Sequence, residues 1–370
     1  MAPPPPVIIP SAPSPIRPTL TAENAVLLDP QASATCDGQA ISPAYSEDLP
    51  PLVSGQAFTT PEIGQRIVTA MLAFSVGVDG RTLNIRQQPL PDAGSESLFN
   101  PAASARYQSA LAAWRFDGGA RSACWLTIRF TPVPVARADH DLLLRYYAVT
   151  RTTGVVRDAV EARLRGPDAD CRRRRPRLAS YPDHRIGAPL PPAGYGWSVV
   201  QWNVDAEGRY DAVATVGSSG DAAYDAETRR AMSENLAWEG AASVGCVYNF
   251  YRRGEPLPAP PLPPVKDDSL ANCPASVRDR FTAFRDPVYP NDFRQRGVEG
   301  WALVRFDIAS WGAIGNVEIV EAQPAAAFAD SALTAVRLGR VTPGFDAGIR
   351  CVVPVRFVME PPRDGAPVAD

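Results

Sequence analysis

The sequence predicts an α+β chain of three tandem small modules, each an antiparallel three-stranded sheet with one main helix, in the order strand, strand, helix, strand. Alternating apolar residues run into a glycine turn at three places, which is typical of half-buried strands that enter hairpins. The spacing from an aromatic residue to that glycine is the same each time: Phe74 to Gly80, Trp202 to Gly208 and Phe306 to Gly312. A helical stretch and a closing strand with a cysteine follow each hairpin. Chance alternation in an alanine-rich chain is the alternative, and the matched spacings argue against it.

The third module shows this order most clearly. Its first strand, Trp301 to Ile308, has one apolar face made of Ala302, Val304, Phe306 and Ile308. The return strand is Asn316 to Val320, and apolar residues at helical spacing predict a helix from Phe328 to Leu338. After Pro343-Gly344, the run Cys351 to Phe357 alternates again and is the closing strand.

The other two modules repeat these elements with different residues. The first has a strand in Met71 to Gly80, with Leu72, Phe74, Val76 and Val78 alternating, a helix from about Pro101 to Trp114, and a closing strand with Cys124, Leu126, Ile128 and Phe130 on one face. The second has Val200, Trp202 and Val204 alternating within Trp197 to Gly208, a helix from Ala226 to Trp238, and a closing strand with Cys246, Tyr248 and Phe250 on one face.

Two kinds of segment fall outside the repeat. Ala138 to Asp170 is an insertion in which Val155 to Leu164 reads as a helix, whereas Asp141 to Thr150 fits a strand or a helix. Met1 to Pro18 has eight prolines and Pro256 to Pro264 has six, so both are expected to be extended linkers. A ligand for an SH3-like partner is the alternative for the first of them.

These features divide the chain into six parts. They are a Pro-rich N-terminal segment (1–30), module 1 (31–137), module 2 with its N-terminal insertion (138–255), a Pro-rich linker (256–264), module 3 (265–360) and a tail (361–370).

The third module resembles the C-terminal domain of the TonB family. The resemblance rests on Tyr289-Pro290, the run Arg296 to Gly300, the turn at Gly312, Asn316-Val317, Pro324-Ala325, the helix opened by Phe328, and Pro343-Gly344. The family usually has Trp-Arg-aromatic at the helix end, where this module has Gly339-Arg340-Val341 and the first module has Trp114-Arg115-Phe116. The resemblance implies the periplasmic end of an energy transducer that acts on outer-membrane transporters.

The six cysteines fall into early and late members of each module. This repeat logic predicts the disulfides Cys36–Cys124, Cys171–Cys246 and Cys273–Cys351, one of fifteen pairings that six cysteines allow. Bridges indicate an oxidising compartment, and the bacterial periplasm fits both them and the resemblance. Six buried thiols in a cytosolic protein are the alternative.

Composition and motifs favour binding over catalysis. A net charge of −3 at pH 7 argues against nucleic acid as a partner. The two histidines, His140 and His184, lie in loop-like stretches, and no phosphate loop, serine elbow or metal-spaced histidine pair is present. We therefore expect no catalytic residue, metal or cofactor. The basic run Arg172 to Arg175 reads as a solvated loop, or alternatively as a contact for anionic lipid or an acidic partner.

In the TonB family, the resemblance implies that the closing strand pairs with a short segment of the transporter. On this chain that strand is Arg350 to Val358, with outward residues Arg350, Val352, Arg356 and Val358. Pro354 departs from a good template because it removes one backbone donor in mid-strand. The alternative is that these residues face solvent only.

The resulting hypothesis is a periplasmic TonB-like protein that binds an outer-membrane transporter or another envelope protein. No apolar run approaches the roughly 18–20 residues that span a bilayer, and no signal peptide precedes Ala2-Pro3. We therefore expect an export signal or inner-membrane anchor that this sequence lacks, and with an anchor, an inner-membrane motor complex as a further partner. The rival hypothesis is a non-catalytic structural or cell-envelope-binding protein that uses the modules as spacers.

Overall fold

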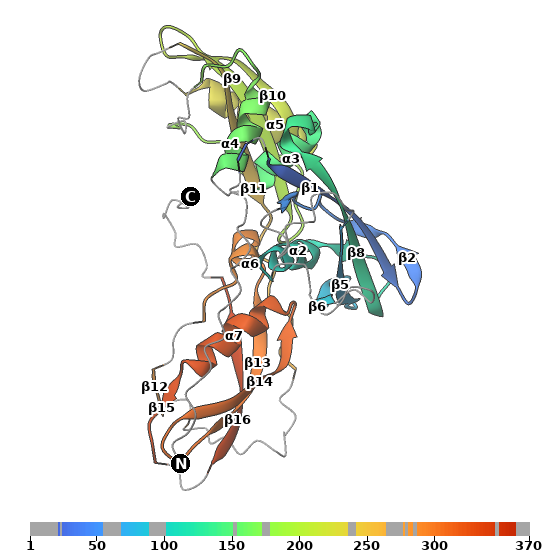
Figure 1. Cartoon of the computed structure of the whole chain (residues 1–370), viewed down its shortest axis with the longest axis vertical. Helices are drawn as coiled ribbons and strands as arrows, with labels where there is room; N and C mark the ends of the chain where they lie inside the picture. The colour runs from blue at the N-terminus through green and yellow to red at the C-terminus, as the bar shows by residue number, and fades with distance from the viewer. Residues whose placement is uncertain are drawn as a thin grey trace, which may run out of the picture.

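The computed structural model shows an elongated α+β molecule with several small antiparallel sheets (Figure 1). It describes residues 21–22, 24–54, 68–88, 101–150, 154–171, 178–235, 242–263, 277, 280–283, 287–344 and 348–359. We call the parts built around strands β5 (Val68–Val76), β9 (Tyr195–Val204) and β13 (Gly300–Ile308) units 1, 2 and 3. Unit 2 and unit 3 lie at opposite ends, and unit 1 lies to one side between them (Figure 1).

The remaining elements are as follows. Unit 1 has β1 (Val26–Cys36), β2 (Gln39–Ile41), β3 (Pro43–Tyr45), β4 (Leu52–Val53), β6 (Thr82–Gln88), α2 (Pro101–Ala113), β7 (Arg115–Phe116) and β8 (Arg121–Pro134). Unit 2 has a 3-10 turn (Val135–Arg137), α3 (His140–Val149), α4 (Val155–Arg165), β10 (Tyr210–Ser218), α5 (Ala222–Ser233) and β11 (Ser243–Arg253). Unit 3 has β12 (Phe281–Ala283), α6 (Asn291–Arg296), β14 (Ile314–Gln323), α7 (Ala327–Arg337), β15 (Arg340–Val341) and β16 (Ile349–Phe357).

The three units share one strand order, in which the first strand lies between the second and the closing strand. The orders are β6-β5-β8, β10-β9-β11 and β14-β13-β16. The aromatic residue of each first strand lies directly opposite the cysteine of the closing strand: Phe74 and Cys124, Trp202 and Cys246, Phe306 and Cys351. The turn glycines all have left-handed φ values, 76° at Gly80, 80° at Gly208 and 86° at Gly312. The shared spacing from the aromatic residue to the glycine therefore identifies equivalent positions in three similar sheets.

Two disulfides connect cysteines that the repeat logic paired. Cys36 bonds to Cys124 and Cys171 bonds to Cys246. Cys351 is also disulfide-bonded and fully buried. Its predicted partner, Cys273, lies outside the described residues, so that pairing stays a prediction.

The sheet of unit 1 is larger than the three strands that the sequence predicts. β1 adds to the outer edge of β8 and pairs antiparallel with it from Val26 opposite Pro134 to Cys36 opposite Cys124. β2 and β4 then pair with β1. β1 begins inside the part of the chain predicted as the Pro-rich N-terminal segment (1–30), because Pro30 and its polar neighbours obscure the alternation of a strand. Val78 also differs from its expected place, because β5 ends at Val76 and Val78 is 88% exposed in the turn.

The insertion before unit 2 forms two helices, α3 and α4, which resolves the ambiguity at 141–150 in favour of a helix. They cover the face of the unit 2 sheet that carries Trp197, Val199 and Val247. The other face, with Val200 and Trp202, packs against α5. α5 begins at Ala222, four residues before the predicted start, because the Asp221 carboxylate accepts hydrogen bonds from the first backbone N–H groups. Trp238, the predicted end, lies outside the described residues.

Glu227 on α5 is expected to make the stability of unit 2 sensitive to acid. Its buried carboxylate accepts hydrogen bonds from the Arg230 guanidinium (2.7 Å) and from the Asp183 N–H (2.8 Å), which lower the pKa of Glu227 from 4.5 to about 2. A lowered pKa in the folded state stabilises the fold above the unfolded pKa and loses that contribution as pH falls toward the folded value.

We therefore expect stability to decline between about pH 4.5 and pH 2 in the wild type, by about 1–2 kcal/mol from this group, since Arg230 is half exposed and solvent screens the pair. Glu227→Gln should remove that part of the pH dependence in urea unfolding measured across this range. Parallel curves for the two proteins would contradict the assignment.

Units 1 and 3 are joined along β6. The backbone of Ile85 donates to the Pro324 carbonyl (2.8 Å) and accepts from the Ala326 N–H (2.8 Å). Behind this contact one hydrophobic core continues from unit 1 into unit 3. A buried ion pair between Glu47 and Arg296 also links the two units, and burial raises the pKa of Glu47 although Arg296 opposes the shift.

The described part of the second Pro-rich segment, 256–263, is packed rather than a free spacer. Leu257 is buried and exchanges two backbone hydrogen bonds with the Gly297–Glu299 stretch (2.8 and 2.9 Å). The indole N–H of buried Trp301 donates to the Pro260 carbonyl at 2.7 Å. Proline keeps its carbonyl acceptor, so a Pro-rich strand can dock through carbonyls and apolar side chains even though it lacks donors.

Candidate partner-binding edge

β16 is the closing strand of unit 3 and lies at one edge of its sheet. It pairs with β13 without a register shift, from Ile349 opposite Ile308 to Phe357 opposite Gly300. Cys351, Val355 and Phe357 are buried on the face that α7 covers. Among the strands that the structure describes, β13 is the one that pairs with β16.

The residues predicted to bind a partner lie on the opposite face of β16 or beyond its end. Val352 is half-buried and Arg356 is exposed. Arg350 donates to Asp307 on β13 (2.8 and 3.4 Å), and Val358 is 59% exposed just after the strand. Pro354 stays in register opposite Leu303, so it does not interrupt the pairing with β13. These side chains therefore follow one strand without converging on a common site.

The residues on which the family resemblance rests pack within unit 3 or lie at the ends of its helices and strands. Tyr289 packs against Phe328 and Phe357, and its hydroxyl donates to the Val298 carbonyl at 2.7 Å. Pro290 precedes α6, and Gly297 ends this helix with a left-handed φ of 74°. Pro343 and Gly344 follow β15. These residues stabilise the fold of unit 3, and this role explains their order and spacing without any contact to a partner.

Two glycines of this set cannot carry a side chain. A Cβ at Gly312 would lie 2.0 Å from the Val341 carbonyl oxygen, and the φ of 86° adds strain for any other residue. A Cβ at Gly300 would meet the Gln323 carbonyl oxygen at 2.6 Å and the Phe328 ring at a similar distance. Both glycines thus allow the close approach between the sheet, the helix and the segment after the helix.

A family model described as the Gram-negative bacterial TonB protein C-terminal matches residues 285–359, the stretch that contains α6, β13, β14, α7 and β16. Unit 3 is a TonB C-terminal domain. A TonB C-terminal domain indicates a TonB-like protein of the Gram-negative envelope. No curated protein matches the chain. In the described part of the chain, none of the helices is long and apolar enough to cross a membrane.

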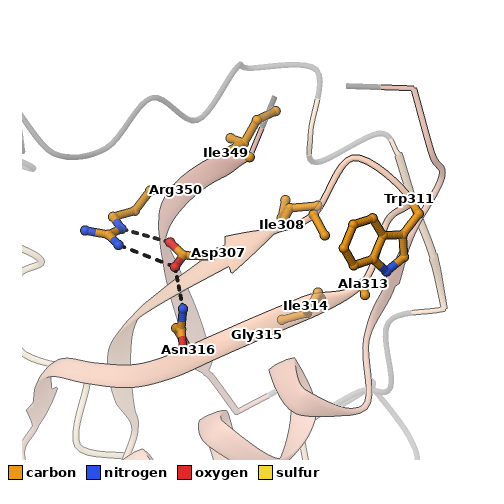
Figure 2. A pocket seen from close by; sticks show the side chains of 11 residues that line it. Asp307, Ile308, Trp311, Ala313, Ile314, Gly315, Asn316, Ile349 and Arg350 are labelled. Carbon is orange, nitrogen blue, oxygen red and sulfur yellow. Dashed lines mark hydrogen bonds and ion pairs between the residues drawn. The ribbon is translucent and has the colours of Figure 1, made fainter. Parts of the chain in front are cut away.

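A pocket of about 740 Å³ lies at the far end of the TonB domain, beside the start of β16 (Figure 2). Its lining comes from the end of β13, the hairpin turn, the start of β14 and the start of β16. Asp307 lies at its polar side, where it accepts hydrogen bonds from Arg350 and from the Asn316 amide (2.8 Å). The Arg350 hydrogen bond, followed by that of Asn316, holds the pKa of Asp307 below its usual range.

This pocket was not predicted from the sequence, although one residue signals it. Trp311 sits in the predicted glycine turn and is 73% exposed, whereas a large aromatic ring is usually at least partly covered. Its neighbours Ile308 and Ile349 are buried beneath the pocket. Asp307 was missed because its register opposite Arg350 depends on strand pairing between residues 43 positions apart.

Both histidines lie outside this site. His140 begins α3 and His184 lies in a turn of unit 2, and both are exposed. Arg172 to Arg175 lie outside the described residues, so neither interpretation of that basic run is tested.

Proposed function

We propose that this chain is a periplasmic, non-catalytic binding protein that recognises an extended segment of an outer-membrane transporter or another envelope protein. The segment adds as a strand to the outer edge of β16. Among the described strands only β13 pairs with β16, and the part of its outer edge that we assign to the partner is Val352 to Phe357, which follows the disulfide-bonded Cys351. Main-chain hydrogen bonds supply affinity in this mode, and flanking side chains supply selectivity.

The observation that carries the proposal is the pairing of β1 with β8 in unit 1. The outer edge of β8 corresponds to that of β16, because Cys124 and Cys351 lie opposite equivalent aromatic residues. β1 occupies the β8 edge over the whole length from Val26 to Cys36. β1 is itself bonded to β8 through Cys36, and its place shows that a strand at this edge is compatible with the sheet and the covering helix of such a unit.

The same comparison supports unit 3, rather than unit 1 or unit 2, as the unit that binds the partner. β1 already covers β8, and α4 packs against β11, while Asp170 and Cys171 donate to the Val244 carbonyl at 3.2 and 3.3 Å. We infer that the three units are diverged copies of one plan with the boundaries 31–137, 138–255 and 265–360. In this interpretation the first two copies became support for the third.

A role in energy transduction belongs to the same proposal in a more demanding form. It requires an inner-membrane anchor joined to this chain and a motor complex that the anchor contacts. The TonB domain supports a contact at the outer membrane in this role. The anchor can be tested by reading the gene for a hydrophobic segment of membrane-spanning length.

The test is titration of the full chain with short peptides from transporter N-terminal segments, each methylated at one backbone nitrogen. An added strand directs every second N–H toward its neighbour, so methylation should weaken binding by about tenfold at alternate positions and leave the others unchanged. Val352→Pro should abolish binding, whereas Arg356→Ala, which keeps the backbone intact, should not.

Binding without this alternation, or binding that Val352→Pro leaves intact in a protein with unchanged circular dichroism, would refute strand addition. Failure of all peptides to bind the wild type would favour the structural role in which the units act as spacers.

A further inference from the structure

We propose that the pocket at the end of the TonB domain binds a neutral oligosaccharide, with one sugar ring stacked on Trp311. The pocket is lined by apolar residues and by three polar side chains, Asp307, Asn316 and Arg350 (Figure 2). This mixture of apolar surface with a few fixed polar groups is typical of small-ligand sites. The inference goes beyond strand addition and does not depend on it.

Trp311 lies where its ring can stack against a ligand. The indole is 73% exposed at the tip of the β13–β14 hairpin, next to Gly312. In units 1 and 2 the residue before the turn glycine is acidic, Asp79 and Glu207. The fold thus accepts an acidic residue at this position, and among the three units the tryptophan is peculiar to unit 3. An exposed aromatic face offers a large, rigid apolar surface for stacking.

One part of the polar network at the pocket belongs to the fold. In unit 3 the Asn316 amide donates to Asp307 at 2.8 Å, and in unit 1 the equivalent Asn84 amide donates to Ser75 at 2.9 Å. Both asparagines have a left-handed φ, 54° at Asn84 and 48° at Asn316, and Ala212 has the same conformation at the equivalent place in unit 2 (49°), so this irregular step belongs to the hairpin. It carries no information about a ligand.

What differs in unit 3 is the ion pair on that network. Arg350 pairs with Asp307 at 2.8 Å, whereas Ala123 and Gly245 occupy the equivalent place in units 1 and 2. A carboxylate and a guanidinium that neutralise each other leave the described lining of the pocket without net charge, which disfavours a phosphate or an amine as the ligand. They still present planar hydrogen-bonding groups in fixed orientation.

A sugar ring meets these requirements together. It is uncharged, its C–H face is apolar and can cover an indole, and its hydroxyl groups both donate and accept hydrogen bonds along the ring edge. The pocket is open to solvent over much of its surface, and its volume of about 740 Å³ exceeds what one ring needs. An oligosaccharide of several units is therefore a better fit than a monosaccharide.

The test is isothermal titration of the full chain with two uncharged probes, a β-1,4-linked tetrasaccharide of N-acetylglucosamine and maltotetraose. We expect one of them to bind, and the probe that binds identifies the source as an amino-sugar polymer or a glucan. Trp311→Ala should weaken that binding by about tenfold or more. Val320→Ala alters an exposed side chain of β14 that lies outside the pocket, so this variant should bind the tetrasaccharide as the wild type does.

Asp307→Asn supplies a second measurement, since it removes the charge balance and keeps the shape. We expect weaker binding of the neutral tetrasaccharide by this variant. No binding of either tetrasaccharide by the wild type, or equal binding by Trp311→Ala, would overturn the proposal. A pocket that instead binds the transporter peptides through Trp311 would overturn it as well, because the occupant would then be a polypeptide.

Discussion

Removal of the Cys36–Cys124 disulfide is expected to lower the free energy of unfolding by about 4–5 kcal/mol. The bridge closes a loop over a sequence separation of 88 residues, and the chain-entropy model gives this magnitude for a loop of that length. It also fixes β1 to β8 at the last residue pair of their ladder. The measurement is urea unfolding of Cys36→Ala/Cys124→Ala beside the wild type without reductant.

The control is the single variant Cys36→Ala, which breaks the same bridge and leaves Cys124 in the core. If loop closure dominates, the single and double variants lose similar amounts of stability. The loop closed by Cys171–Cys246 does not overlap this one, so the losses from the two bridges should add. A loss below about 1 kcal/mol in the double variant would show that β1 and β8 hold together without the bridge.

The second large effect is expected at Asp221, where alanine should cost about 3–5 kcal/mol. Its carboxylate accepts hydrogen bonds from the N–H groups of Ala223 and Tyr224 at the start of α5 and from Ala188 (3.2, 3.1 and 2.7 Å). It also pairs with Arg252, whose side chain is 5% exposed. Alanine would leave this guanidinium buried without its counter-charge and would remove the helix cap.

Burial alone would favour the protonated form of Asp221, but the hydrogen bonds from Tyr224, Ala188 and Ala223 together with Arg252 hold its pKa below the usual value. The stabilisation is therefore present at neutral pH and declines in acid. Asp205→Ala is the matched control in the same unit, because Asp205 pairs with the exposed Arg209 in a turn. Equal losses from the two substitutions in thermal unfolding would contradict the importance of burial at Asp221.

The parts of the fold that the sequence predicted are those that depend on local patterns. Phe74, Trp202 and Phe306 lie on alternating strands before glycine turns, so their faces follow from the period of a strand. The cysteines could be paired because each copy supplied the same two positions. The TonB resemblance was readable because Tyr289, Gly300 and Gly312 have packing roles that tolerate few substitutes.

The parts that could not be predicted depend on contacts between distant segments. β1 carries Pro30 and polar residues in mid-strand, and only its pairing with β8 makes it a strand. The Pro-rich run around Leu257 was predicted to be a spacer. Leu257 is buried there because its backbone pairs with Val298, which is distant in the sequence. The pocket needed the register that brings Arg350 to Asp307, and no local pattern encodes that register.

The contact between Ile85 and the Pro324–Ala326 stretch has a consequence for synthesis. Asn84 and Gln323 hydrogen-bond to each other beside this contact and are 239 residues apart in the sequence. Unit 1 therefore emerges from the ribosome long before unit 3 has been synthesised. During that interval β6 presents a bare strand to other chains, a recognised route to aggregation. A chaperone that covers β6 until the C-terminal third has been synthesised would therefore raise the yield of this protein.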